Sequence, residues 1–566
     1  MNASLTLVRF FKQKHLYFVF LAIGTVVLLL HTTHMGWFIC DDAYITLRYA
    51  QQWAFEGAPF FNATGNPVEG YTNFLWMAIF AFVHMLRLNA SLFALLASAI
   101  SGVAVLFGLV FLFKILLPEN EHRFLRFVST IFLILLTVCF APFAFWVSTG
   151  METMFFTALL LFSVIAVLQF SPTRKSIIIT SFLWSAVALT RPEGVFLGLW
   201  AFTVLIFLTL RNEDFCSRAF LYATVALMIF VSIVGTHLLW RYFTYGQWLP
   251  LTYYAKVSGI NPTFLIRHGA AYVRAFVSVF FLTPLVIASI IAIVSARIHF
   301  ETGRARWFLA TMILLLTVHV IRSGGDFMAM FRFLIPIWPL FLALAVVGIV
   351  EIGLRLFRLP FIQKLCNSTI LTVILLVAIG LPIVISSWRF EQKSIASERP
   401  QFMMESVAGM IHFAQDRARI GRILRNVLPK SARDNTFMVV GGAGALSYES
   451  RIGRIIDTFG LLDPEVAHMR IQPGSFTKPG HLKQASRERI RSLNADILCN
   501  PGIAWIGRGQ PPTSWSKTLE TQWPFYTPFC IVAHLSHDDQ GRQRTHYCCL
   551  RKKNRLEQLT LHTVSP

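Results

Sequence analysis

The sequence carries little charge. Only 14% of its 566 residues are Asp, Glu, Lys or Arg, 55% are hydrophobic, and the mean hydropathy is +0.60. A soluble domain has about 25% charged residues, so this composition excludes an ordinary soluble protein and indicates an integral membrane protein. Acidic residues are scarcest, 28 against 50 basic ones, which gives a net charge of +22. Since no basic module with interleaved aromatic residues is present, we assign that charge to cytoplasmic loops and lipid headgroups, and expect no nucleic-acid partner.

Several motifs of soluble enzymes and metal sites are also absent. The chain has no Gly-x-Ser-x-Gly, P-loop, His-Glu-x-x-His or Cys-x-x-Cys sequence, and no convincing internal repeat. Four of its 8 cysteines lie in the C-terminal part: Cys499, Cys530, Cys548 and Cys549. If that part is outside the cytoplasm, we expect one disulfide among them, whose connectivity the sequence leaves open.

Apolar runs of membrane-spanning length are abundant. We predict eleven spans, at 17–38, 91–117, 127–147, 152–170, 176–190, 194–210, 219–240, 276–297, 307–321, 333–350 and 369–387. The first follows Arg9, Lys12 and Lys14 as in a signal peptide, but no small-residue cleavage site follows it, so we predict an uncleaved span. The segment 72–90 is interpreted as a helix along the outer interface.

Placing 72–90 along the outer interface makes the distribution of basic loops consistent with the positive-inside rule. With 72–90 outside the bilayer, the short basic loops all fall on the side of the N-terminus, as the positive-inside rule requires. We therefore predict a multi-pass membrane protein with a cytoplasmic N-terminus and its C-terminal part outside the cytoplasm. The loops placed outside are rich in charged and aromatic residues, which suggests that they share a site.

Two domains are predicted. Residues 1–390 form a transmembrane catalytic domain, and 391–566 a soluble α/β domain with mixed polar and apolar segments. In the second, 437–440 is typical of a buried strand and 494–498 begins another. The glycine-rich 441–444 lacks the G-x-G-x-x-G spacing of a nucleotide fold, so we interpret it as a structural turn.

Asp41 and Asp42 stand together at the outer end of the first span. The pattern from Asp42 to Glu56 predicts a short amphipathic helix that stops at Gly57, with an Asp as its N-cap. One Asp suffices for a cap. The second can act as a general base, share a proton, or bind a metal ion with its neighbour, so the sequence leaves a divalent metal open and no cofactor certain.

Cations lie in the predicted outer loops, against the charge rule. Lys256 and Arg332 are embedded in aromatic, turn-rich segments, and Arg191 and Arg322 lie beside apolar spans. Charge-assisted hydrogen bonds from such groups suit a phosphate at the membrane surface. The alternative is that they extend to lipid headgroups.

These segments together resemble bacterial members of the GT-C glycosyltransferase superfamily. The resemblance is carried by Asp41–Ala50, Val68–Trp76, Thr149–Thr153, Thr190–Gly194 and the segments ending at Lys256 and Pro336, and covers roughly residues 1–390. It points to the arabinofuranosyltransferase-like or dolichyl-phosphate-mannose mannosyltransferase-like branch. The C-terminal part resembles the extracytoplasmic domain of the mycobacterial arabinofuranosyltransferase-like relatives. Leu251 stands where relatives often have Asn.

The resemblance implies a multi-span enzyme that uses a polyprenyl-phosphate sugar. It implies that Asp41 or Asp42 is the catalytic base, and the likeness to bacterial members indicates the inner membrane, with the C-terminal part in the periplasm. Our own hypothesis is that Lys256 and Arg332 hold the donor phosphate, with Arg191 and Arg322 as further candidates, and that one direct displacement onto an envelope glycan, lipid or protein inverts the anomeric centre. Further substrate contacts are expected from the same segments: Glu69, Tyr71, Glu152, Tyr253, Tyr254 and Asp326.

Two other classes of function remain as alternatives. A lipid or glycolipid transporter or flippase needs charge deep within its spans, whereas the span centres here are nearly free of charge. A non-catalytic envelope scaffold leaves the Asp pair unexplained.

Overall fold

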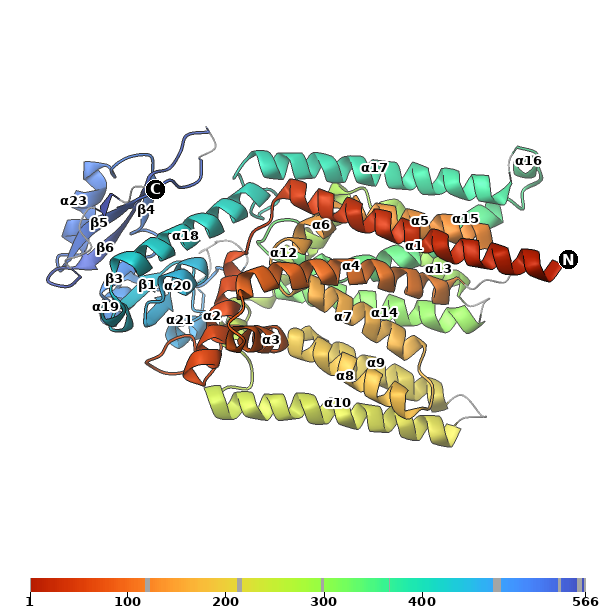
Figure 1. Cartoon of the computed structure of the whole chain (residues 1–566), viewed down its shortest axis with the longest axis horizontal. Coiled ribbons are helices and arrows are strands. Elements are labelled where there is room, and N and C mark those ends of the chain that lie inside the picture. The colour runs from red at the N-terminus through yellow and green to blue at the C-terminus, as the bar shows by residue number, and fades with distance from the viewer. Residues whose placement is uncertain are drawn as a thin grey trace.

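The structure, a computed structural model, describes residues 2–117, 123–210, 216–296, 300–365, 367–471, 480–537, 541–556 and 562–563. Parts of three predicted basic loops, 118–122, 211–215 and 297–299, lie outside this set. A bundle of long helices forms one body, and an α/β domain covers the end of the bundle opposite the N-terminus (Figure 1).

Helices occupy all eleven predicted spans. The bundle comprises α1 (Asn2–Met35), α4 (Ala90–Leu116), α5 (Arg123–Val138), α6 (Ala141–Val147), α7 (Thr153–Leu168), α8 (Arg174–Thr190), α9 (Glu193–Leu210), α10 (Cys216–Tyr245), α12 (Pro262–Val279), α13 (Thr283–Ser295), α14 (Phe300–Ser323), α15 (Trp338–Leu356) and α17 (Ser368–Ala396), with α16 (Pro360–Gln363) in a loop. Among the described residues, seven helices are long and apolar enough to cross a membrane singly, or up to nine if each bent pair is one span. The shorter α7 and α8 account for the difference from eleven.

Two predicted spans are not straight helices. The prediction of one continuous span over 276–297 is wrong, because α12 and α13 meet at 102°. Phe281 has φ of +52° at the break, and Pro284 lies in the first turn of α13, where its missing N–H costs no hydrogen bond. Similarly, α5 and α6 meet at 65°.

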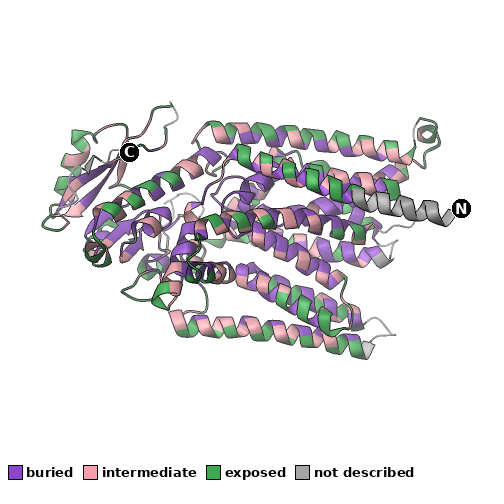
Figure 2. Ribbon diagram, viewed as in Figure 1, coloured by how far each residue is buried: buried purple, intermediate pink, exposed green. Residues whose placement is uncertain are grey.

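The outside of the bundle is apolar. On α10, Phe243 is 81% exposed, and large apolar side chains are also exposed along α17. Figure 2 shows exposed residues along both helices at the edges of the bundle, with buried residues concentrated inside it. Exposed apolar surface of this extent matches a surrounding of lipid chains, as expected for a multi-span membrane protein.

Short helices cover the end of the bundle beneath the α/β domain: α2 (Asp41–Glu56), α3 (Phe74–Met85), α11 (Leu251–Lys256) and the 3₁₀ turn η1 (Arg332–Leu334). The 12 residues of α3 span about 18 Å at 1.5 Å per residue, too short for a hydrocarbon core of about 30 Å. This length agrees with the interfacial position predicted for 72–90.

The C-terminal domain contains one mixed sheet. Its elements are α18 (Val407–Val427), α19 (Lys430–Asp434), β1 (Phe437–Val440), α20 (Ala445–Ser450), β2 (Arg454–Asp457), α21 (Pro464–His468), α22 (Arg487–Leu493), β3 (Ile497–Cys499), β4 (Trp505–Gly507), α23 (Thr513–Gln522), β5 (Tyr526–Val532), β6 (His546–Lys552) and β7 (His562–Thr563). The strand order is β2-β1-β3-β6-β5-β7, with β4 also paired to β6. β1 runs parallel to β2 and β3, and β6 antiparallel to β3 and β5. Disulfides Cys499–Cys549 and Cys530–Cys548 join these strands, two where one was expected.

The sheet buries both faces. Along β1, Met438 and Val440 belong to the same core as the transmembrane bundle, whereas Val439 packs on the other face with Trp523. The alternation follows from the two-residue period of a strand. Because one continuous core runs from the bundle into the domain, the domain sits directly on α2, which packs against α18 and α20.

Candidate active site

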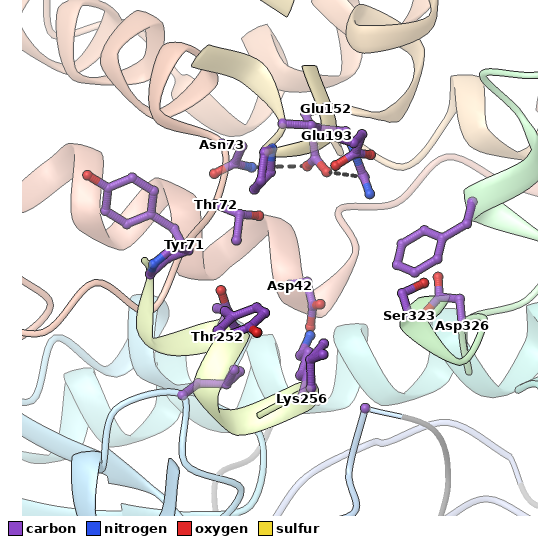
Figure 3. A pocket seen from close by; sticks show the side chains of 18 of the residues that line it. Asp42, Tyr71, Thr72, Asn73, Glu152, Glu193, Thr252, Lys256, Ser323 and Asp326 are labelled. Carbon is purple, nitrogen blue, oxygen red and sulfur yellow. Dashed lines mark hydrogen bonds and ion pairs between the residues drawn. The ribbon is translucent and has the colours of Figure 1, made fainter. Parts of the chain in front are cut away.

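A cavity of about 250 Å³ lies where α2 and α11 meet the outer ends of the bundle helices. Side chains from α2, the segment before α3, α11 and the end of α14 point toward the same space (Figure 3). Eight of the predicted site residues line it: Asp42, Tyr71, Glu152, Arg191, Tyr253, Lys256, Asp326 and Arg332. The outer-loop segments thus converge on one cavity, which we call the first cavity.

The two aspartates occupy the first turn of α2 and do not cap it. Cys40 is the N-cap residue, with no capping bond from its side chain, so the predicted Asp cap is wrong. The helix ends at Gly57, as predicted, in the left-handed conformation with φ of +80°. Carboxylates in a first turn interact favourably with the helix dipole. Since neither Asp is needed as a cap, both are available for other contacts.

Arg191 is held between two carboxylates. Its guanidinium donates to Glu152 at 3.0 Å and to Glu193 at 2.5 Å. Glu152 also accepts a hydrogen bond from Asn73 at 3.0 Å, which ties the segment before α3 to the turn that follows α6. This buried network fixes the arginine in place at the wall of the cavity.

Arg332 forms a second buried pair, with its Nε 2.6 Å from Asp326. The guanidinium carbons of Arg332 and Arg191 lie 4.9 and 5.1 Å from the ring centre of Phe333. Burial alone would lower the pKa of Arg332, but the carboxylates of Asp326, Asp42 and Glu152 raise it above its ordinary value. Two permanently charged arginines therefore lie on one side of the cavity.

Asp42 and Lys256 differ from these paired groups. Both side chains line the first cavity (Figure 3), and within the described residues neither has a side-chain hydrogen bond or ion pair. Lys256 is the last residue of α11 and is half-buried. The carboxylate of Asp42 and the ammonium group of Lys256, neither of which has a hydrogen bond or ion pair among the described residues, thus line the same cavity.

A second cavity, of about 620 Å³, lies between α2 and the C-terminal domain. It shares Asp42, Ile45, Phe327 and Leu461 with the first cavity. The two cavities therefore adjoin at Asp42. Asp41 lines the second cavity only.

The domain holds Asp41 in place. Its Oδ1 accepts a hydrogen bond of 2.8 Å from the N–H of Ala445, the first residue of α20. A Cβ on Gly444 would lie 2.0 Å from the main-chain oxygen of Asp41, so only glycine permits this approach. Burial, which outweighs the Ala445 hydrogen bond, raises the pKa of Asp41 to about 6.

Besides Asp41, three predicted site residues do not line the first cavity. Glu69 is buried beneath it and pairs with Arg241 at 2.6 Å, and burial raises the pKa of Glu69 to about 7. Tyr254 faces the C-terminal domain, where its ring stacks on His468 at 4.5 Å. Arg322 is exposed, because it lies about 100° around α14 from Ser323, which does line the cavity.

Other lining residues were not predicted. The first cavity is also lined by Thr252, Asn73, Glu193 and His319. These residues lie within or beside the segments that carry the resemblance, so the predicted site residues near them in the sequence could have indicated them. The second cavity takes Arg417 and Phe413 from α18, which no motif marked. From the 457–464 segment, Phe459 and Leu461 line it, together with His481.

Asp457 has a structural role. Its carboxylate accepts hydrogen bonds from the N–H groups of Phe459, Leu461 and Leu462 at 3.0, 3.2 and 2.6 Å. These bonds shape the loop that carries Phe459 and Leu461 to the second cavity.

The structure offers no obvious metal centre. In the described ranges no group of three His, Cys, Asp or Glu side chains could hold a metal ion. Asp41 is engaged by Ala445, and of the two aspartates Asp42 alone lines the first cavity. We therefore derive no chemical step that runs through a metal.

A family model described as "Domain of unknown function (DUF8728)" matches residues 408–546, the greater part of the C-terminal domain. No curated protein matches the chain in sequence.

Solved structures share the fold. The crystal structure of ArnT from Cupriavidus metallidurans bound to undecaprenyl phosphate covers 97% of this chain and 99% of its own, with TM-score 0.52 and 11% identity. The apo form covers 95% and 98%, with TM-score 0.51 and 11% identity. The archaeal oligosaccharyltransferase AglB from Archaeoglobus fulgidus, in complex with an inhibitory peptide and a dolichol-phosphate, covers 79% and 65%, with TM-score 0.47 and 10% identity. The chain thus has the fold of ArnT over nearly its whole length, which confirms the predicted GT-C fold class.

Proposed function

We propose that the protein is an inverting glycosyltransferase that moves a sugar from a polyprenyl-phosphate donor to a hydroxyl group of an envelope glycan, lipid or protein. The observation that carries the proposal is the first cavity, where the unengaged Asp42 carboxylate faces Lys256, Arg332 and Arg191. A general base and a phosphate site are the two requirements of this reaction. The ArnT structure with the same fold holds undecaprenyl phosphate, a ligand of the same chemical class as the proposed leaving group.

Asp42 acts as the base in this proposal. Its carboxylate takes the proton of the acceptor hydroxyl while that oxygen attacks the anomeric carbon of the donor sugar. The bond between the anomeric carbon and the phosphate oxygen breaks, and its electron pair stays on the phosphate. A single displacement of this kind inverts the anomeric centre. Asp41 is the poorer candidate, because its carboxylate is engaged by Ala445.

The cations stabilise the leaving phosphate. Lys256 has no partner in the described part of the chain, so its ammonium group can pair with the phosphate at no cost to another contact. Arg332 and Arg191 are fixed by carboxylates, and they add positive potential without rearrangement. Tyr253 and Tyr71, which line the same cavity, are placed to contact the donor sugar.

The charge distribution supports an orientation with this site outside the cytoplasm. The α/β domain lies at the end of the bundle opposite the N-terminus, next to α2, which contributes to the first cavity (Figure 1), while the predicted basic loops lie toward the N-terminal end. A lipid-linked donor suits such a site, since the periplasm has no nucleotide sugars.

The test uses the purified full chain in detergent with a panel of radiolabelled polyprenyl-phosphate sugars and an envelope extract as acceptor. Release of free lipid phosphate is followed for Asp42→Asn, Lys256→Met and, as an exposed control, Arg322→Leu. Asp42→Asn is expected to lower turnover by about 10²–10⁴-fold while undecaprenyl phosphate still binds. Lys256→Met is expected to weaken that binding, and Arg322→Leu to change neither. Full turnover by Asp42→Asn would remove the base, and movement of intact donor across vesicles without phosphate release would favour a transporter.

A further inference from the structure

Arg417 of the C-terminal domain lines the second cavity. Its guanidinium carbon lies 4.9 Å from the ring centre of Phe413 and 4.5 Å from that of Tyr547. The two rings hold the flat guanidinium by cation–π contacts, which leave its N–H donors available for hydrogen bonds. The rings therefore orient the arginine without a hydrogen bond or ion pair to a carboxylate.

Two other charged residues of the same helix have hydrogen-bond or ion-pair partners, whereas Arg417 has neither, although its positive charge acts across the cavity to lower the pKa of Asp41. Arg422 pairs with Glu449 at 3.2 Å, and Asp416 accepts hydrogen bonds from the N–H and hydroxyl of Ser536 at 2.8 and 2.6 Å. In the part of the chain that the structure describes, the guanidinium of Arg417 has no hydrogen bond or ion pair. An oriented arginine with free donors that faces a cavity is suited to a carboxylate or phosphate of a ligand.

The rest of the second cavity suits a sugar ring. Phe327 and Phe459 pack edge-on against the ring of His481, at 4.3 and 4.5 Å, and form an aromatic wall. Acidic side chains also line the cavity: Asp41, Asp42 and Glu405 have carboxylates that can accept hydrogen bonds from the hydroxyl groups of a sugar. Apolar faces with a few oriented polar groups are what small-molecule sites present, and about 620 Å³ is within their usual range.

Glycine keeps the cavity open beside α2. A Cβ on Gly442 would lie 3.2 Å from Oδ2 of Asp41 and 3.2 Å from the ring of Phe413. Because Gly442 has no side chain, the loop after β1 can pass close to Asp41 and Phe413. A ligand in the second cavity can therefore reach Asp42, at the junction with the first cavity.

We propose that the second cavity binds the acceptor of the proposed transfer, and that this acceptor is an anionic glycan whose carboxylate or phosphate pairs with Arg417. The assignment as acceptor site rests on the proposed function. The C-terminal domain then selects the acceptor, while the transmembrane part holds the donor, and the two substrates meet at Asp42.

Binding of defined oligosaccharides to the full chain in detergent tests this inference. The probes are tri-galacturonate, which is anionic, and maltotriose, which is neutral, each titrated by calorimetry with undecaprenyl phosphate at saturation so that the first cavity is filled. Wild type is expected to bind tri-galacturonate at least about tenfold more tightly than maltotriose, and Arg417→Leu to lose that preference. Equal affinity for both probes, or no binding of tri-galacturonate at millimolar concentration, overturns the proposal.

Two control variants locate the effect. Arg419→Leu removes an exposed arginine from the same helix that lies outside this cavity, and it is expected to keep the preference for tri-galacturonate. Lys256→Met removes the free cation of the first cavity and is also expected to keep it. Loss of the preference in Lys256→Met with its retention in Arg417→Leu would place the anion in the first cavity and overturn the proposal.

Undecaprenyl phosphate binding separates this inference from the proposed function. Arg417→Leu is expected to bind that lipid as wild type does, which also shows that the variant is folded. If wild type binds no undecaprenyl phosphate, the donor proposal fails. Tri-galacturonate binding that depends on Arg417 would still establish an anionic glycan site.

Discussion

Asp41 and Asp42 are neighbours in the sequence with different surroundings in the fold. Asp42 faces both cavities and its side chain has no hydrogen bond or ion pair within the described chain, whereas Asp41 accepts a hydrogen bond from the N–H of Ala445. Consecutive helix residues point about 100° apart, so adjacent carboxylates on α2 reach different neighbours. This difference is the reason why we assign the base to Asp42 and not to Asp41.

The raised pKa of Asp41 predicts a pH-dependent stability. Burial raises this pKa to about 6 in the folded protein, above its ordinary value near 4, so the folded state binds the proton more tightly than the unfolded one. The resulting stabilisation is full below pH 4 and is lost as pH rises through 6. Asp41→Asn stays neutral and keeps an oxygen for Ala445. The unfolding free energy of this variant, relative to that of wild type, should therefore rise by about 2 kcal/mol between pH 4 and pH 7. The expectation would be contradicted if the unfolding midpoints of Asp41→Asn and wild type changed by the same amount across this pH range.

Arg48 is a buried cation that joins the first outer loop to the C-terminal domain. It donates to the carbonyl oxygens of Phe61, Ser447 and Ile452 at 2.8, 2.5 and 2.6 Å, and it is 3% exposed. Arg48→Met keeps much of the volume but removes three hydrogen bonds to buried carbonyl oxygens. We expect a loss of about 3 kcal/mol or more in the unfolding free energy, measured by denaturation in detergent. The exposed Arg419→Met should change it by less than about 0.5 kcal/mol, and similar losses in both variants would contradict the role given to Arg48.

At the scale of elements, the contact between α2 and α20 couples the proposed base to the C-terminal domain. The close approach depends on Gly444, beside the main chain of Asp41. On the neighbouring helix, Leu251 of α11, where relatives often have Asn, packs with Ala467 of α21. The domain thus contacts two helices that carry site residues, which gives its docking a direct influence on the first cavity.

Gly444→Ala should separate α2 from α20. The added Cβ would lie 2.0 Å from the Asp41 main-chain oxygen, and backbone cannot yield as a flexible side chain does. Hydrogen exchange of α2 and α20 should rise while the bundle interior stays protected, and lipid phosphate release should fall at least about tenfold. Gly509→Ala, where a Cβ meets nothing within 4 Å, is the matched control. Unchanged exchange in α2 would show that this contact does not hold the domain.

At the scale of the whole molecule, the apolar bundle and the disulfide-bearing domain suit different surroundings. The domain's two disulfides require an oxidising compartment, which agrees with the position outside the cytoplasm that the basic loops predict. The proposed orientation therefore rests on two independent properties, loop charge and cysteine pairing.

Cysteine labelling of intact cells checks this orientation. Gln415→Cys places a thiol on the exposed side of α18, and Lys364→Cys places one in the loop at the opposite end of the bundle. A membrane-impermeant maleimide should label position 415 in intact cells and position 364 only after permeabilisation. Labelling in the reverse pattern would place the site in the cytoplasm and remove the reason for a lipid-linked donor.

The sequence predicted most of the first cavity but little of the second. Lys256, Arg332 and Arg191 lie in polar segments between apolar runs, a pattern visible without a structure. Arg322 stands in such a segment too, yet it faces outward, because a polar position does not state the rotation of its helix. Arg417 lies on an amphipathic helix among other arginines, where its lack of a partner has no local signature.

The sequence alone determined that the chain is a bundle of membrane helices with an α/β domain after it, since run length, charge and residue period are properties of local segments. Only the tertiary structure decided which aspartate is engaged, where the spans bend, and that Arg417 and Asp42 line one cavity. Those outcomes depend on contacts between segments hundreds of residues apart. Such contacts are set by the packing of the whole core, which no local pattern encodes.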